Sequence, residues 1–81
     1  MKKIEFVKDG ILTTYRIEEA FMEEGFRILV DYENRKESVT WIDKDGESDR
    51  IFEKREDAEM VVLEYVNKLL KIGAIEKFVV S

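Results

Sequence analysis

Apolar and polar residues alternate with two different periods along this chain, and the longer period marks a single helix. Between Arg55 and Gly73, apolar residues recur every three or four positions, which places them on one helical face. Acids begin this segment and lysines end it, as the partial charges of helix termini favour, and Gly73 suits the left-handed residue that ends a helix. The predicted apolar face consists of Ala58, Val62, Tyr65, Val66 and Leu69, flanked by Val61 and Ile72.

The residues just before the helix predict a weak N-terminus. Glu53 and Lys54 precede Arg55, whereas Ser, Thr, Asp or Asn are the residues whose side chains accept hydrogen bonds from the first free N–H groups of a helix. We therefore expect some fraying of the first turn.

The N-terminal residues show the two-residue period of a β-strand. Residues 3–7 alternate, and Asp9-Gly10 follows, a pair that tolerates the positive φ angles of a tight hairpin turn. With these two as the loop, Phe6 faces Thr13 and Ile4 faces Tyr15 in the return strand. The side predicted to face the core contains Ile4, Phe6, Ile11, Tyr15 and Ile17.

A second strand pattern follows an ambiguous segment. Residues 18–24 fit either an extended, bulged strand or a helical turn, and we favour the strand. After Gly25, residues 26–32 give the clearest alternation of the chain, with Phe26, Ile28, Val30 and Tyr32 on one face.

The remaining strands are shorter. A polar turn over 34–38 leads to a predicted strand over 39–43, and Lys44-Asp45-Gly46 predicts a second hairpin, with 50–52 returning beside the strand 39–43. Residues 75–80 predict a last strand after the helix.

Together these elements predict an α+β fold, an antiparallel sheet of four to six strands with one long helix packed on one face. Residues 1–81 form one domain, near the size at which a single core only just offsets chain entropy.

Net charge and hydropathy limit which kinds of partner the chain can bind and where in the cell it is expected. The chain has 19 acidic and 14 basic residues, a net charge of -5, so nucleic acid and anionic membranes are repelled on average and direct nucleic-acid binding is not expected. Uninterrupted apolar runs are too short to cross a membrane, and the N-terminus lacks the apolar region of a secretory signal. We expect a cytoplasmic location.

The residue types exclude several kinds of chemistry. The absence of Cys and His removes disulfides, thiolate zinc sites and the commonest proton shuttle. The acids at 43–49 have the wrong spacing for a helix-flanked calcium loop, and those at 18–24 would act as an acid–base pair only within a pocket. We therefore expect no enzymatic activity, no cofactor and no metal.

By elimination, the sequence favours a protein-interaction module, for example a small acidic regulator or inhibitor that binds a basic surface of a partner protein. By analogy, small acidic single domains without a catalytic site are a common form for inhibitors carried by phages and mobile elements. The candidate partner-binding residues are Glu18, Glu19, Glu23, Glu24, Asp43, Asp45, Glu47 and Asp49.

An alternative function and a self-association stay open. A nucleic-acid or small-ligand binding domain would use Trp41 across from Arg50, with Arg16 and Arg27 on the sheet, as a stacking platform. A homodimer would use either the last strand, whose edge has few charges, or Leu63 and Leu70, which widen the apolar arc of the helix.

Overall fold

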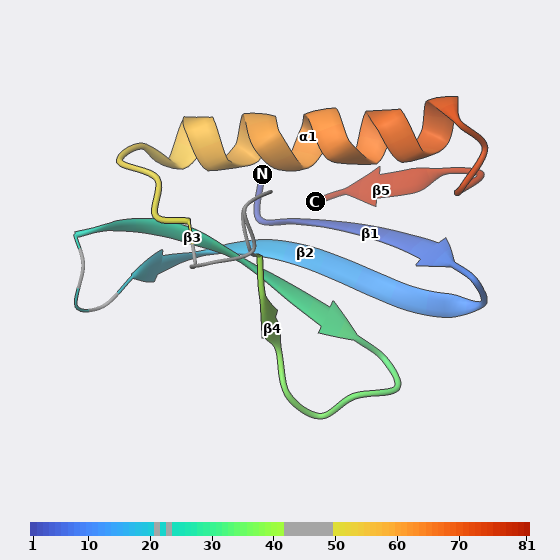
Figure 1. Cartoon of the computed structure of the whole chain (residues 1–81), viewed down its shortest axis with the longest axis horizontal. Coiled ribbons are helices and arrows are strands. Elements are labelled where there is room, and N and C mark those ends of the chain that lie inside the picture. The colour runs from blue at the N-terminus through green and yellow to red at the C-terminus, as the bar shows by residue number, and fades with distance from the viewer. Residues whose placement is uncertain (21, 23, 42–49) are drawn as a thin grey trace.

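A computed structural model describes residues 1–20, 22, 24–41 and 50–81. Within these residues the chain is an α+β fold in which one helix lies along an antiparallel sheet of five strands, as predicted (Figure 1). The strand order is β4-β3-β2-β1-β5. The elements are β1 (Lys3–Lys8), β2 (Ile11–Ala20), β3 (Gly25–Tyr32), β4 (Val39–Thr40), α1 (Arg55–Lys71) and β5 (Phe78–Val80).

The first hairpin forms in the predicted register. Asp9 and Gly10 both have positive φ angles, 53° and 78°, as a two-residue turn that follows the strand twist requires. Ile4 is therefore paired with Tyr15 and Phe6 with Thr13. The local sequence of the turn thus decides which side chains of β1 and β2 face the helix.

The core lies between α1 and one face of the sheet. Its largest fully buried side chains are Ile4 and Ile28 from the sheet and Val62 and Val66 from the helix. Ile72, predicted at the flank of the apolar stripe, is the residue that caps the helix and is exposed. Further buried core residues are Phe6, Tyr15, Ile17, Val30, Phe52, Ala58, Leu69 and Ile75.

The two ends of α1 differ, and Gly73 ends the helix as the sequence predicts. At the C-terminal end, Gly73 has a φ of 77°, its N–H donates to the Leu70 carbonyl and the Ala74 N–H donates to the Leu69 carbonyl. This pair of bonds is the Schellman arrangement, which satisfies carbonyls that the helix leaves free. At the N-terminal end, Lys54 has the extended geometry of a cap residue but makes no side-chain capping bond.

Several strand boundaries differ from the prediction. β2 ends at Ala20, and Glu24 lies in a turn with a φ of 44°, so among the described residues of 18–24 the favoured strand is present at 18–20. The last strand is shorter than 75–80, since Ile75 is buried in the core ahead of β5. The residues predicted as the second hairpin tip, 44–46, lie outside the described part of the chain.

The prediction that 50–52 returns beside the strand 39–43 is wrong. Phe52 exchanges two backbone hydrogen bonds with Phe26, at 2.7 and 2.8 Å, near the start of β3. β4 pairs farther along the same edge of β3, where Val39 lies opposite Val30. The hydrophobic side chain of Phe52 is buried in the core, and this burial at the helix start decides where the segment returns.

Gly25 makes this return possible. A Cβ atom at position 25 would lie 2.6 Å from Ile51 Cγ2 and 2.7 Å from the Phe52 carbonyl oxygen, closer than packed atoms can approach. The bridge between Phe26 and Phe52 therefore depends on a residue without a side chain next to it.

We expect Gly25→Ala to lower the free energy of unfolding by about 1–3 kcal/mol, the usual cost of forcing extra atoms into a packed site. The neighbouring change Glu24→Gly should leave stability unchanged or raise it by up to about 1 kcal/mol, because it removes a side chain from a left-handed position. Urea unfolding of both variants measures the difference. Equal stability of Gly25→Ala and the wild type would show that the 51–52 segment does not approach this closely.

We expect Lys54→Asp to raise the free energy of unfolding by about 1 kcal/mol, since an aspartate at this position can accept a hydrogen bond from a free N–H of the first turn. The matched change Lys68→Asp, in the last turn, should destabilise because it places a negative charge at the negative end of the helix. Thermal unfolding followed by circular dichroism compares the two. A stabilising Lys68→Asp would contradict a helix that ends at Lys71.

Candidate functional site

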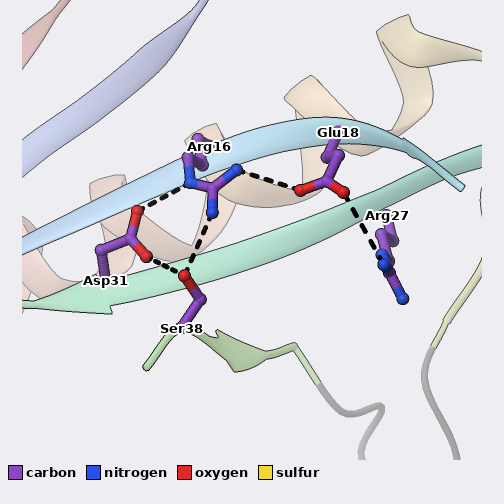
Figure 2. Close-up of polar contacts among 5 residues, drawn as sticks. All are labelled: Arg16, Glu18, Arg27, Asp31 and Ser38. Carbon is purple, nitrogen blue, oxygen red and sulfur yellow. Dashed lines mark hydrogen bonds and ion pairs between the residues drawn. The ribbon is translucent and has the colours of Figure 1, made fainter. Parts of the chain in front are cut away.

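The sheet face opposite α1 contains a network of charged side chains. Arg16 on β2 is at its centre: its Nε donates to Asp31 at 2.7 Å, its Nη1 to Glu18 at 3.0 Å and its Nη2 to the Ser38 hydroxyl at 3.1 Å. Ser38 in turn donates to the other oxygen of Asp31, and Arg27 lies 3.7 Å from Glu18 (Figure 2). These five residues form the arginine network.

Strand alternation explains why these side chains meet. In the pairing of β2 with β3, Glu18 lies directly opposite Arg27, and Arg16 reaches diagonally to Asp31, two positions farther along β3 than Leu29, its direct partner. Ser38 precedes β4, which pairs with the other edge of β3. The network therefore joins the start of β4 to the central strands.

The charges of the network are mutually stabilised. Partial burial raises the pKa of the Asp31 carboxyl, but the hydrogen bonds from Ser38 and Arg16 and the charge of Arg16 outweigh it, so its pKa is below the usual 3.8. The hydrogen bond to Asp31 is the main cause that raises the pKa of Arg16. Ser38 therefore faces a carboxylate that holds protons weakly, which suits a structural clamp and not a nucleophile with a base.

A second cluster of carboxylates lies where the β2–β3 turn meets the segment leading into α1. Glu19, Glu24 and Glu53 line a shallow pocket of about 390 Å³ together with Ala20, Gly25 and Phe26. All three glutamates are exposed, and none forms an ion pair with another described residue. We call Glu19, Glu24 and Glu53 the acidic rim.

The structure divides the predicted acidic residues. Glu18 and Glu19 are consecutive strand residues and point to opposite faces, so Glu18 enters the arginine network while Glu19 joins the acidic rim. Glu53 was not among the predicted site residues, because its place beside Glu19 depends on the bridge between Phe26 and Phe52. The predicted partner-binding residues that lie outside the described part of the chain are Glu23, Asp43, Asp45, Glu47 and Asp49.

The predicted stacking platform does not form. Trp41 packs on the helix side of the sheet, with ring centroids 5.7 Å from Tyr15 and 5.1 Å from Tyr65. Arg16 belongs to the network on the opposite face, and Arg50 lies over the Phe52 ring, 4.6 Å from its centroid. Burial raises the pKa of the Tyr15 hydroxyl, and the neighbouring Tyr65 and Tyr32 raise it further, so Tyr15 is neutral.

A larger groove lies at the other end of the molecule. It has a volume of about 680 Å³ and is bounded by the 73–77 loop and by apolar side chains of β1, β2 and β5, among them Val7, Leu12 and Val79. Leu63 is half-buried against the core, whereas Leu70 is 38% exposed, so the two predicted oligomer-contact residues differ in how much surface they offer.

No known relative identifies either the network or the rim. No family model, curated protein or solved structure matches the chain. In residues 1–20, 22, 24–41 and 50–81, no three acidic, His or Cys side chains are grouped so as to hold a metal ion, and no helix is both long and apolar enough to cross a membrane.

We expect the arginine network to make stability depend on acid. Because the pKa of Asp31 is lowered by folding, its contribution is complete above 3.8 and is lost as the pH falls through the folded-state pKa. Asp31→Asn should therefore flatten the fall in unfolding free energy below about pH 4. Chemical unfolding between about pH 2 and pH 7 measures this fall.

Ser38→Ala is the matched control, since it removes one hydrogen-bond donor to Asp31 and leaves the carboxylate and Arg16 in place. It should give a slope between those of the wild type and Asp31→Asn. Parallel curves for all three proteins would show that the network does not lower the pKa of Asp31.

Proposed function

We propose that this protein is a non-enzymatic interaction module, a small acidic regulator or inhibitor that binds a basic surface of a partner protein through the acidic rim. The observation that supports it most is that Glu19, Glu24 and Glu53 line one pocket and have no cationic partner among the described residues. A cytoplasmic location and a phage or mobile-element origin are parts of the same proposal.

The contrast with the arginine network supports this choice of surface. Arg16 and Arg27 largely neutralise Glu18 and Asp31, and these carboxylates are available to a partner only if existing ion pairs break. The rim carboxylates have no cationic partner among the described residues, and together with a net charge of -5 they would accelerate encounter with a basic protein. Binding at the rim therefore costs less than binding at the network.

The residues that line the pocket indicate which kind of side chain would bind in it. Its walls are carboxylates, while Ala20 and Phe26 supply apolar surface. A lysine or arginine side chain matches this combination, because its aliphatic stem packs on apolar surface and its charged head reaches acids at the edge. The predicted acids at 43–49 would extend the surface, and their contribution stays a prediction.

The alternative, a nucleic-acid or small-ligand binding domain, was based on a stacking platform that the described residues do not form. Its platform required Trp41 and the sheet arginines on one surface, and they lie on opposite faces of the sheet. We therefore propose protein binding alone.

We expect the variant with Glu19→Gln, Glu24→Gln and Glu53→Gln to bind an oligolysine peptide roughly tenfold more weakly than the wild type. Three exposed ion pairs of about 0.5 kcal/mol each account for that factor. Isothermal titration calorimetry at low and physiological salt measures it, and the wild-type affinity should fall with salt.

The matched control changes three exposed glutamates outside the rim, Glu33→Gln, Glu64→Gln and Glu76→Gln, and so alters net charge equally. It should retain most of the wild-type affinity. If both triple variants lost the same affinity for the peptide, net charge alone would explain the loss. That result would contradict a binding site at the rim. Capture of a basic protein from lysate that high salt does not release would contradict the electrostatic basis.

A further inference from the structure

The outer edge of β5 has backbone groups that no described strand uses. β5 pairs with β1 on one side and is the last strand of the sheet on the other (Figure 1). Val79 and Val80 are 60% and 47% exposed. An apolar edge of this kind is where a further strand can add, because its N–H and C=O groups point into solvent.

The hydrogen bonds to β1 determine which residues point outward. Lys3 and Ser81 exchange both backbone bonds, at 3.1 and 3.0 Å, so Ser81 faces β1. Since bonding alternates along an antiparallel strand, Val79 also faces β1, whereas Phe78 and Val80 direct their N–H and C=O groups to the open edge. The open edge thus offers two residues, placed symmetrically about Val79.

We propose that a second copy of this chain pairs with the open edge, β5 against β5, with the two-fold axis at Val79. In this register Phe78 of each copy lies opposite Val80 of the other, and both outward-facing residues find partners. Registers centred on Phe78 or on Val80 would pair only one of the two within β5. The dimer would have one continuous sheet, and it does not depend on the acidic rim.

The side chains suit this register. The opposing pairs are apolar, Phe78 with Val80 and Val79 with Val79, and the next position places Lys77 opposite Ser81, so no like charges meet. The axis also makes the two helices antiparallel on one face of the joined sheet. In antiparallel helices the acidic first turn of one lies toward the basic last turn of the other. These opposite charges attract each other.

Part of the helix also belongs to the interface. A stable dimer buries about 800 Å² per partner, more than a three-residue strand supplies. Glu59 contacts the Met1 amino group at 3.2 Å, so its side of α1 faces the β1–β5 edge, and Leu63 and Leu70 follow at helical spacing on that side. The strand edge and these two leucines together give a small interface, for which we expect micromolar association.

Disulfide formation between two copies tests the proposed β5–β5 register directly. The chain has no Cys, so Val79→Cys can form a disulfide only between copies. At the axis the two Cα atoms would be about 4.5 Å apart, the spacing of a non-hydrogen-bonded pair and within the range a disulfide spans. Val7→Cys is the matched control, because Val7 is 56% exposed on the same sheet face but one strand away from the edge.

The experiment combines sedimentation equilibrium of the wild type with mild oxidation of both cysteine variants and with Val79→Lys, which places two positive charges at the axis. We expect the wild type to be a dimer and its association to be roughly tenfold weaker in Val79→Lys. We expect Val79→Cys to cross-link rapidly and Val7→Cys to cross-link little. A single 9.6 kDa species at all concentrations would overturn the proposal. So would equal cross-linking of the two cysteine variants, or a dimer lost in Leu70→Lys and retained in Val79→Lys.

Discussion

The structure depends on the contact between one helix and one face of a sheet. Val62 and Val66 from the helix and Ile4 and Ile28 from the sheet are fully buried in one core cluster. Because one helix covers one face, the other face must be stabilised in a different way. The arginine network lies on that face and connects β2, β3 and the residue before β4 through partly exposed ion pairs and hydrogen bonds, each of which contributes little energy.

Aromatic contacts connect this core to the candidate site. Tyr65 stacks on Tyr15 at 5.9 Å and meets Trp41 edge-on, which fastens β4 and the sheet to the middle of the helix. At the helix start, Phe52 enters the core while its backbone pairs with Phe26. That bridge places Glu53 beside the β2–β3 turn and so assembles the acidic rim. The rim is therefore a consequence of core packing, although its members are exposed.

Local patterns predicted the parts of the fold whose causes are local. The Asp9-Gly10 turn decided the register of the first hairpin, and three- and four-residue spacing decided the buried face of α1. The return of Phe52 to β3 was missed because it depends on a distant contact that only Gly25 permits. The separation of Glu18 from Glu19 follows from the alternation of the strand that the sequence favoured for 18–24, although both were grouped as one predicted acidic surface. Glu53 gave no comparable sequence signal.

The central claim is that binding of a basic partner occurs at the rim formed by Glu19, Glu24 and Glu53. Two-dimensional nitrogen–proton NMR of the labelled protein, titrated with an oligolysine peptide, tests it most directly because it reports on every backbone amide at once. We expect that, among the residues that the structure describes, the largest shifts occur at positions 19, 24, 25 and 53 and disappear at high salt. Shifts centred on Arg16 and Asp31, or spread evenly over all exposed acids, would contradict it.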